Sequence, residues 1–372
     1  MSFSEDSLWM RIVRGDARTP RERATAAALR LLSMVYGGAL KLHLAGYRLG
    51  VARRTRFPAL VVSVGNLTVG GTGKTTASVA VAKWLSEHGR RVAYLSRGYR
   101  GAGERRSLIV SEGFGPLLPA DISGDEPFMI ARALPEVFVL VGKDRRRTGA
   151  LALEKFGIDA MVLDDGFQYQ RLARDINVVL VDALMPFGYD FLVPRGLLRE
   201  PPSHLARADA IWITHSDLVR RNDLQAIRER VERLAPHARI WETVHQPVRL
   251  RSLVVDDVIE LDALGGRKIC ALSSLGNPLA FERSLERLGA ELTARVRFPD
   301  HHAYRADELR ATLDDQANGA EWIVTTEKDA VRIPEEALNR PSWALDVELA
   351  GRPGAPDLSE VLSCLLRGKS AT

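Results

Sequence analysis

A glycine-rich turn around residue 70 carries the clearest chemistry in this sequence of 372 residues. The turn follows an apolar run at residues 61–64 and precedes a helical pattern that begins at Lys74. Glycines let backbone N–H groups close around phosphate oxygens, Lys74 supplies positive charge to a β- or γ-phosphate, and Thr75 offers a hydroxyl group to Mg²⁺. We therefore predict a loop that binds a nucleoside triphosphate. The residues of this phosphate loop are Thr68, Val69, Gly70, Gly71, Thr72, Gly73, Lys74, Thr75 and Thr76.

The phosphate loop alone leaves several classes of nucleotide-binding protein open. It departs from the usual pattern at Thr68, which stands where the first glycine is common. Partition-type ATPases carry an additional lysine directly before the Gly-Gly pair, and Val69 stands there instead. A GTPase needs an N/T-K-x-D motif, whereas Thr326-Glu327-Lys328-Asp329 has its lysine one place late. The sequence therefore favours a kinase over a partition-type ATPase or a GTPase.

Two adjacent carboxylates follow another apolar run. Residues 160–163 lead into Asp164-Asp165-Gly166, and open α/β sheets bind their ligands at the carboxyl ends of strands. An acidic residue at such a strand end is typical of a Mg²⁺ site beside a phosphate loop. The alternative is an ordinary Asp-Gly turn. The sequence does not decide which of the two aspartates meets the metal ion.

A kinase that acts on a hydroxyl group also needs a residue to accept or orient the proton. Gly124-Asp125-Glu126-Pro127 places two acids in a constrained turn, although such a turn can equally start a helix. Residues 298–304 combine Asp300, His301 and His302 with aromatic side chains. An Asp–His pair would serve, but adjacent histidines rarely face one metal ion, and the sequence cannot show that the two segments meet.

Several arginines are candidates for holding phosphate groups. They are Arg97 and the run Arg145-Arg146-Arg147. Guanidinium groups match phosphate oxygens in charge and geometry. An ordinary solvated basic surface explains the same residues equally well.

The pattern around these motifs predicts an α/β protein of two domains. Short apolar runs alternate with helical stretches, as in a doubly wound, mostly parallel sheet of the P-loop NTPase type. The expected strands of the first domain are residues 59–64, 91–95, 137–141, 160–163, 176–181 and 210–214. We place the P-loop domain at residues 56–237, an extended connector at 238–265 and a smaller α/β domain at 266–372, with strands at 268–272 and 321–325 and helices at 278–288 and 306–316.

The first 55 residues form a separate basic segment. From Arg11 to Arg56 eleven basic residues face only Asp16 and Glu22, a net charge of +9, while the whole chain carries +5. Charge confined to one end suggests an anionic surface as partner, whereas nucleic-acid binders usually spread it over the fold. We predict no nucleic acid and no obligate protein partner.

The apolar stretch in this segment predicts an amphipathic helix. Its longest uncharged run has ten residues, from Leu31 to Leu40, which is too short to span a bilayer. One stripe of the helix would be basic and the opposite side apolar, as in helices that lie on a membrane; the alternative is a helix packed on its own domain. The basic stripe is Arg23, Arg30, Lys41 and Arg48, and the apolar side is Leu29, Leu32, Tyr36, Ala39 and Tyr47. The two cysteines, Cys270 and Cys364, form no disulfide or zinc pattern and fit a reducing compartment.

The motifs together resemble one family. In order they are VGNLTVGGTGKT, SRGYRG (96–101), GDEP (124–127), LDDGFQ (163–168), VPRGLLREP (193–201), LGNP (275–278), FPDHHAY (298–304) and TTEKD (325–329). This combination resembles the tetraacyldisaccharide 4'-kinases of lipid A biosynthesis from about residue 30 to residue 332. Departures from the family's pattern are Thr76, Ser274 and Arg332, and none touches the chemistry.

The resemblance implies transfer of the ATP γ-phosphate to the 4'-hydroxyl of an acylated glucosamine disaccharide 1-phosphate. The enzyme would work as a peripheral protein on the cytoplasmic face of the bacterial inner membrane, with ATP and Mg²⁺ as cofactors and the lipid substrate and an anionic membrane surface as partners. The implied catalytic residues are Lys74 and Asp125, with His301 as the partner of Asp125. The implied metal ligands are Thr75, Asp164 or Asp165, and Glu200; Thr326, Lys328 and Asp329 would lie near the nucleotide. A membrane-bound nucleotide switch, a partition-type ATPase and a metal- or cofactor-insertion chaperone remain alternatives.

Overall fold

The structure is a computed structural model that describes residues 8–98, 107–255, 257–275, 278–299 and 302–370. The chain divides into two compact units. The larger unit contains the described residues up to His245 and those from Leu349 onward, and the smaller unit is Gln246–Glu348. The chain leaves the larger unit within one strand and returns to it within another, so neither unit is a simple half of the sequence.

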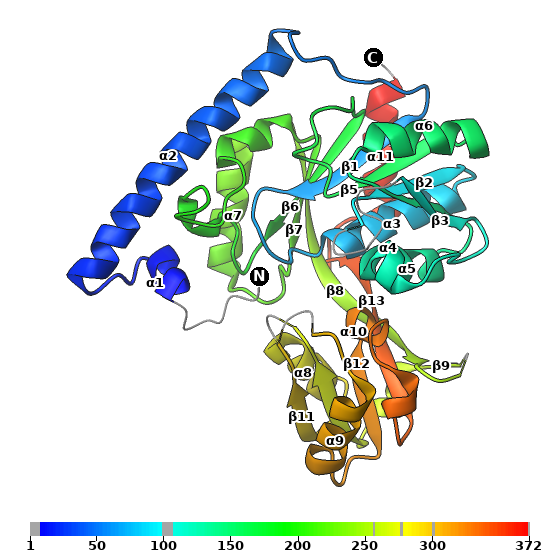
Figure 1. The fold of residues 1–372 in the computed structure, drawn as a ribbon. Coiled ribbons are helices and arrows are strands. Elements are labelled where there is room, and N and C mark those ends of the chain that lie inside the picture. Colours follow the sequence, from blue (N-terminus) through cyan, green and yellow to red (C-terminus); the bar gives the residue numbers. More distant parts are fainter. Residues whose placement is uncertain (1–7, 99–106, 256, 276–277, 300–301, 371–372) are drawn as a thin grey trace. The chain divides into compact units, whose positions relative to one another are not determined.

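A mostly parallel sheet forms the centre of the larger unit (Figure 1). Its order is β8-β7-β6-β1-β5-β2-β4-β3, and every pairing is parallel except that of β3 with β4. This confirms the predicted fold class; the edge strand β3 was not predicted. The strands are β1 (Leu60–Asn66), β2 (Val92–Ser96), β3 (Leu108–Glu112), β4 (Phe138–Val141), β5 (Ala160–Asp164), β6 (Ile176–Asp182), β7 (Ala210–Thr214) and the first part of β8 (Arg239–Ser252).

Helices cover both faces of this sheet because successive side chains of a buried strand point to opposite faces. In β5, Val162 packs with α3, α5 and α11 on one face, while Met161 and Leu163 pack with α6 on the other. Helix α7 covers the face near β6 and β7. The helices are α1 (Leu8–Arg14), α2 (Pro20–Arg48), α3 (Lys74–Glu87), α4 (Ala120–Ser123), α5 (Asp125–Ala133), α6 (Arg145–Phe156), α7 (Arg221–Leu234) and α11 (Leu358–Ser370), with 3₁₀ turns η1 (Gly188–Asp190) and η2 (Pro202–Arg207).

The smaller unit is a second α/β layer structure. Strands β11, β10, β12 and β13 are parallel neighbours in that order, and β9 pairs antiparallel with β8. The predicted helices and strands are present here, whereas β11 and β13 were not predicted. The elements are β9 (Val258–Ile259), η3 (Leu261–Leu264), β10 (Lys268–Ser273), α8 (Pro278–Arg287), β11 (Glu291–Arg297), α9 (Ala306–Gln316), β12 (Trp322–Thr326), α10 (Glu327–Ala330), η4 (Glu335–Ala337) and β13 (Ser342–Gly351).

The domain boundaries differ from those expected at residues 238, 266 and 372. Half of the expected connector is the continuous strand β8, which serves both units. The C-terminal helix α11 belongs to the larger unit, because its apolar side packs into the core beside α3. The Trp84 indole also donates a hydrogen bond of 3.0 Å to Ser359 Oγ. Sequence patterning locates such a helix but cannot tell which core it completes.

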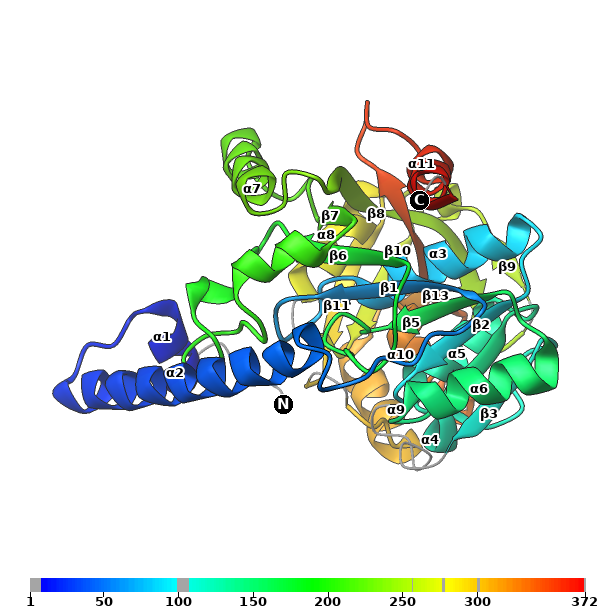
Figure 2. The same cartoon turned by 90° about the horizontal axis from the view of Figure 1, so that it is seen from above.

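Helix α2 is the longest described helix and runs beside the larger unit, with its N-terminal end projecting (Figures 1 and 2). A capping box fixes its start, since Thr19 accepts from the N–H of Glu22 while the Glu22 carboxylate accepts from Thr19 N. Glu22, Ser33 and Leu44 mark the side that packs on the unit. Within the described residues, none of the helices is both long and apolar enough to cross a bilayer.

The exposed side of α2 differs in detail from the prediction. At about 100° per residue, Leu29 and Tyr47 fall on the same side as Ser33, and both are half-buried. The most exposed apolar side chains instead form an outer face of Leu31, Met34, Val35 and Leu42, which are 63%, 67%, 64% and 77% exposed. The predicted basic stripe is fully at the surface and borders this outer face.

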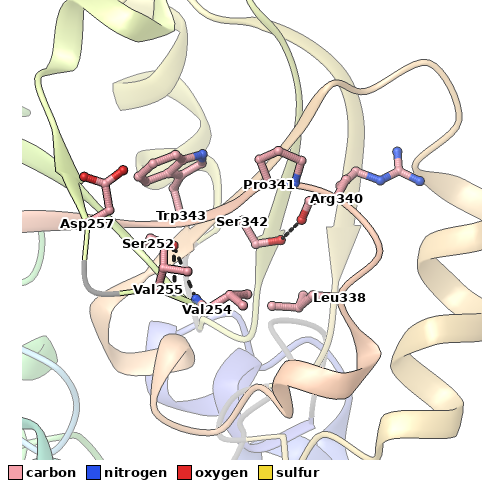
Figure 3. A pocket seen from close by; sticks show the side chains of 9 residues that line it. All are labelled: Ser252, Val254, Val255, Asp257, Leu338, Arg340, Pro341, Ser342 and Trp343. Atoms are coloured by element: carbon pink, nitrogen blue, oxygen red, sulfur yellow. Dashed lines mark hydrogen bonds between the residues drawn. The ribbon is translucent and has the colours of Figure 1, made fainter.

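The smaller unit also contains a depression of about 420 Å³ (Figure 3). It lies between the segment that follows β8 and the start of β13, with Trp343 and Pro341 among its walls. The Ser252 hydroxyl inside it accepts from the backbone N–H groups of Val254 and Val255. Among the residues that the structure describes, none of those predicted to act in catalysis or nucleotide binding lines it.

Candidate active site

The phosphate loop connects the carboxyl end of β1 to the first residue of α3. Asn66 holds the loop closed, since its side-chain amide donates to Thr68 Oγ1 at 3.2 Å and to Thr72 Oγ1 at 2.9 Å. Gly73 has φ +80°, and a Cβ there would lie 2.7 Å from the ring nitrogen Nε2 of His245. Glycine is required at this position for two reasons. A left-handed backbone costs other residues free energy, and the His245 ring leaves no space for a Cβ atom. The predicted strand, glycine turn and helix are therefore present.

Lys74 is the first residue of α3 and folds back over the loop. Its ammonium group donates to the carbonyl oxygen of Gly70 at 3.2 Å. Burial lowers the pKa of Lys74, while the nearby negative charges of Asp165 and Asp164 act to raise it. The lysine thus stands among the carboxylates that follow β5, where a phosphate group would be drawn to it.

The two aspartates at the end of β5 occupy different environments. β1 and β5 are paired neighbours with Val64 beside Asp164, which places the aspartate next to the phosphate loop. Asp164 is 6% exposed, and Ser78 Oγ donates to it at 3.3 Å. Burial raises the pKa of Asp164 to about 7, and the charges of Glu126 and Asp165 act in the same direction. Its negative charge is therefore only partly balanced by the protein.

Asp165 forms an ion pair with an arginine. Both of its oxygens accept from the guanidinium group of Arg199, each at 2.7 Å, and Arg199 also donates to the carbonyl oxygen of Asn66 at 3.2 Å. Burial acts to raise the pKa of Asp165, but the hydrogen bonds and charge of Arg199 lower it to about 2. Asp165 has a positive φ of 47°, so the strand ends in a sharp turn. Arg199 links this turn to the end of β1, and sequence reasoning had not assigned it a role.

The second acid of the GDEP motif, Glu126, contributes its charge to the site. Asp125 is the first residue of α5 and is half-buried. Glu126 raises the pKa of Asp164 and acts on that of Lys74. Both acids belong to the predicted motif, but only Asp125 was predicted to act in catalysis.

Glu200 is held in a buried ion-pair cluster. It is 1% exposed, and its carboxylate accepts hydrogen bonds from Arg207 and from His204, whose Nδ1 lies at 2.6 Å. Within the described parts of the chain, no three acidic, histidine or cysteine side chains lie close enough to hold a metal ion by themselves.

Of the arginine candidates, Arg145 is the one built into the site. It is 7% exposed and lies over the ring of Tyr169 at 5.0 Å. Burial lowers the pKa of Arg145, whereas the charges of Asp164 and Asp165 act to raise it. Arg146 instead pairs with Asp144 at 2.7 Å on the surface. The side chain of Arg97 is exposed.

The remaining predicted residues belong to the smaller unit. Thr326 caps α10, since its hydroxyl accepts from Asp329 N at 3.2 Å. Asp329 is fully buried and accepts hydrogen bonds from Ser274 N at 3.0 Å and from Arg332 at 2.9 Å. Lys328 directly precedes Asp329 on α10. Asp300 and His301 lie outside the described residues, as do residues 99–101 and 276–277 of the predicted motifs.

A parallel sheet with a phosphate loop after its central strand, a lysine at the helix start and a carboxylate on the neighbouring strand defines a P-loop nucleotide-binding protein. Comparison with known proteins narrows this class. A family model described as tetraacyldisaccharide-1-P 4'-kinase matches residues 25–367. The chain belongs to the tetraacyldisaccharide 4'-kinase family, which confirms the resemblance seen in the motifs.

Individual relatives support the assignment. A tetraacyldisaccharide 4'-kinase from Anaeromyxobacter dehalogenans strain 2CP-C is 45% identical over 329 residues, covering 88% of this chain and 85% of the relative. One from Syntrophus aciditrophicus is 41% identical over 337 residues, covering 88% and 90%. The crystal structure of the "apo" form of LpxK from Aquifex aeolicus in complex with ATP matches with a TM-score of 0.74 at 28% identity, covering 93% of this chain and 99% of that one.

Because Asp164 and Asp165 lie in unequal environments, replacing each of them with asparagine should change the stability of the folded protein in opposite directions. The folded-state pKa of Asp164, about 7, lies above its ordinary value of 3.8, so the stability that its protonated form contributes is complete below about pH 4 and is lost as the pH rises through 7. Asn cannot ionise and keeps this contribution. We expect Asp164→Asn to stabilise the metal-free protein at about pH 8 by roughly 1 kcal/mol or more, measured by urea unfolding in a chelator.

Asp165→Asn is the matched control. The folded-state pKa of Asp165 is lowered to about 2, so its contribution is present above about pH 4 and is lost only as the pH falls through 2. This variant should be destabilised at about pH 8, because it loses the ion pair with Arg199. Asp164→Asn being less stable than the natural protein at that pH would contradict the assignment of unbalanced charge to Asp164.

Proposed function

We propose that this chain transfers the γ-phosphate of ATP to the 4'-hydroxyl of a tetraacylated glucosamine disaccharide 1-phosphate, a step of lipid A biosynthesis. The observation that carries the proposal is the placement of Lys74 beside the buried carboxylate of Asp164, at the carboxyl ends of adjacent strands. Membership of the family supports the choice of acceptor. A nucleotide switch would need the same loop but no lipid acceptor.

We further propose that Mg²⁺ binds between the Thr75 hydroxyl and the Asp164 carboxylate. Asp164 suits a divalent cation because its charge is buried and only partly balanced by Lys74 and Arg145. When bound, the ion would neutralise charge on the β- and γ-phosphates. Asp165 and Glu200 remain possible ligands, although each would first have to release an arginine, Arg199 or Arg207.

The other site residues act through position and charge. Lys74 and the backbone N–H groups of residues 70–73 would hold the phosphates of ATP, as phosphate loops do. Arg145 is placed to act on the same charges. We propose Asp125 as the group that accepts the proton of the 4'-hydroxyl, with His301 as its orienting partner. The nucleotide contact of Thr326, Lys328 and Asp329 is likewise a proposal from the family's motif.

We also propose that α2 holds the enzyme on an anionic membrane surface as a peripheral protein. Its outer face offers four exposed apolar side chains, and the stripe of Arg23, Arg30, Lys41 and Arg48 borders that face. Apolar side chains can enter the acyl boundary of a leaflet while neighbouring cations meet anionic headgroups. The lipid substrate would reach the enzyme from the same leaflet.

The reaction can be tested directly. The purified chain, labelled ATP, Mg²⁺ and the disaccharide 1-phosphate in mixed micelles should give labelled glycolipid in equal amount to ADP. Lys74→Ala should reduce turnover on the order of 10²–10⁴-fold, since it removes a charge that acts on the transferred phosphate. ADP formation without labelled glycolipid would refute the kinase reaction and favour a switch or ATPase.

Substitutions of the two acids of the GDEP motif should have different kinetic effects. Asp125→Asn should lower kcat on the order of 10²–10⁴-fold with little effect on the KM for ATP, because it removes the proton acceptor. Glu126→Gln removes a charge that raises the pKa of Asp164, so it should move the acidic limb of the pH–rate profile to lower pH. A larger loss of kcat in Glu126→Gln than in Asp125→Asn would reverse the proposed roles.

Membrane binding can be assigned to the outer face of α2. The variant with Leu31, Met34, Val35 and Leu42 all changed to Gln should lose most co-sedimentation with anionic vesicles, since burial of this apolar area contributes to binding. Phe114→Gln with Leu117→Gln is a matched control, because these side chains are also exposed and apolar but lie outside α2. Equal co-sedimentation of the α2 variant and the natural protein would contradict the proposal.

A further inference from the structure

A second depression in the larger unit is lined by five arginines. It measures about 510 Å³, and we call it the arginine pocket. Its guanidinium groups come from the end of α2, the segment before β1, the segment before β6 and the last residue of η2. They belong to Arg48, Arg54, Arg56, Arg174 and Arg207.

The arginine pocket is separate from the nucleotide site. Its residues precede β1, β6 and β7, at the amino ends of these parallel strands. The phosphate loop and Asp164 follow β1 and β5 at the carboxyl ends. None of the five arginines is among the residues proposed to hold ATP or to accept the proton of the acceptor hydroxyl.

Neutral oxygens, and not carboxylates, position two of the arginines. Arg174 donates to the carbonyl oxygens of Gly166 at 3.0 Å, Phe167 at 3.1 Å and Tyr169 at 3.2 Å. Arg174 and Arg54 both donate to the side-chain oxygen of Gln170, each at 3.3 Å. These contacts fix the two guanidinium groups but leave their positive charge in place.

Three carboxylates near the pocket offset only part of the charge. Asp175 lies 3.4 Å from Arg56 but also accepts from Val61 N at 2.8 Å. Glu200 is shared between Arg207 and His204. Asp209 accepts from Asn177 N at 2.8 Å, and its charge acts on Arg174. Each of these three carboxylates thus also contacts a group outside the five arginines.

Two of these arginines lie in surroundings that disfavour their positive charge. Burial lowers the pKa of Arg174 to about 10, and the positive charges of Arg207 and Arg54 act in the same direction. The Nε and Nη1 groups of Arg207 are buried and have no hydrogen-bond partner among the described residues. Both groups are covered by the protein, and the guanidinium group lies over the Phe167 ring at 4.2 Å. The positive charge of Arg207 still favours a ligand that brings oxygen acceptors and negative charge.

The surroundings indicate where such a ligand comes from. Arg48 is the last residue of α2, and Leu49 and Val51 directly after it are 78% and 83% exposed. Exposed apolar side chains are therefore found both on the outer face of α2 and beside the rim of the pocket. A phosphate group that reaches Arg48 is therefore expected to be attached to a lipid.

We propose that the arginine pocket binds the phosphate group of an anionic membrane lipid, at a site distinct from those for ATP and for the acceptor hydroxyl. A phosphomonoester headgroup fits the pocket well, because it offers three oxygens to several guanidinium groups at once. The inference rests on the proposed membrane association of α2 for the source of the phosphate, and not on the kinase reaction.

The test uses the full chain and substitutions at the rim. Arg174 and Arg207 hold the turn after Asp165 and the Glu200 carboxylate, so they are left unchanged. Arg48→Gln, Arg54→Gln and Arg56→Gln are combined in a pocket variant. Arg23→Gln, Arg30→Gln and Lys41→Gln form a stripe variant that loses the same charge from α2. Retained affinity for ATP, measured by calorimetry, shows that each variant keeps its fold.

Binding is measured on phosphatidylcholine vesicles that contain phosphatidic acid or an equal surface charge of phosphatidylglycerol. The natural protein should prefer phosphatidic acid, and inorganic phosphate should weaken this binding more than chloride does at the same ionic strength. The pocket variant should lose the preference and bind phosphatidic acid vesicles about tenfold or more weakly. The stripe variant should bind both vesicles more weakly and keep the preference.

Three results would overturn the inference. Equal binding of phosphatidic acid vesicles by the pocket variant and the natural protein would leave only diffuse attraction by the stripe. Binding of inorganic phosphate by the natural protein, with unchanged vesicle binding in the pocket variant, would assign the pocket to free phosphate. A loss seen only on neutral vesicles that carry the disaccharide 1-phosphate would assign it to the substrate. Pocket-dependent lipid binding without phosphorylated glycolipid would refute the proposed reaction and leave this inference standing.

Discussion

The charge balance between the start of α3 and the end of β5 is the constraint on which the larger unit depends. Pairing of β1 with β5 forces the phosphate loop and Asp164 to be neighbours. Burying a carboxylate there costs free energy unless cations lie close by, and Lys74, Arg145 and the Asp165–Arg199 pair surround it. The protein leaves part of the charge unbalanced, which is what a site for Mg²⁺ and a nucleotide needs. The buried charge lowers stability at the position where the proposed Mg²⁺ site needs an ionised oxygen.

The same ion pair connects this site to the N-terminal helix. Arg199 belongs to the loop between β6 and η2, whose backbone pairs with the phosphate loop through Val69 N and Leu197 O at 2.8 Å. On its other side, the loop packs against α2: Ser33 Oγ donates to the carbonyl oxygen of Leu192 at 2.8 Å, and the Tyr36 hydroxyl donates to that of Arg199 at 2.9 Å. The helix proposed to rest on the membrane is therefore fixed to the residue that holds Asp165. If α2 rests on the membrane, the γ-phosphate of ATP would be held at a fixed distance from the membrane surface, where the acceptor hydroxyl of the lipid could reach it.

Sequence patterning predicted what depends on local composition. The buried parallel strands read as apolar runs, and the phosphate loop is recognisable because its glycines must lie in sequence order between a strand and a helix. Contacts between distant segments were not predictable. Arg199 and Asp165 are 34 residues apart, and nothing in either motif shows that they pair. Likewise α11 carries an apolar pattern, but only the structure shows that it completes the core beside Trp84. Strand β11 was missed although Leu292, Ala294 and Val296 alternate with polar residues, which is the signal of a half-buried strand.

The arginine pocket illustrates the same limit and explains why arginine is used there. Its residues come from four segments, so the sequence shows only scattered basic residues. A lysine at position 174 would carry the charge, but its single ammonium group could not bridge three carbonyl oxygens and the Gln170 side chain. A purely structural arginine would explain those contacts at Arg174. It explains Arg207 only in part, because Glu200 balances one positive charge while Arg174 and Arg54 place two more beside it. The excess charge therefore indicates a ligand, and the exposed apolar rim indicates that the ligand is a lipid.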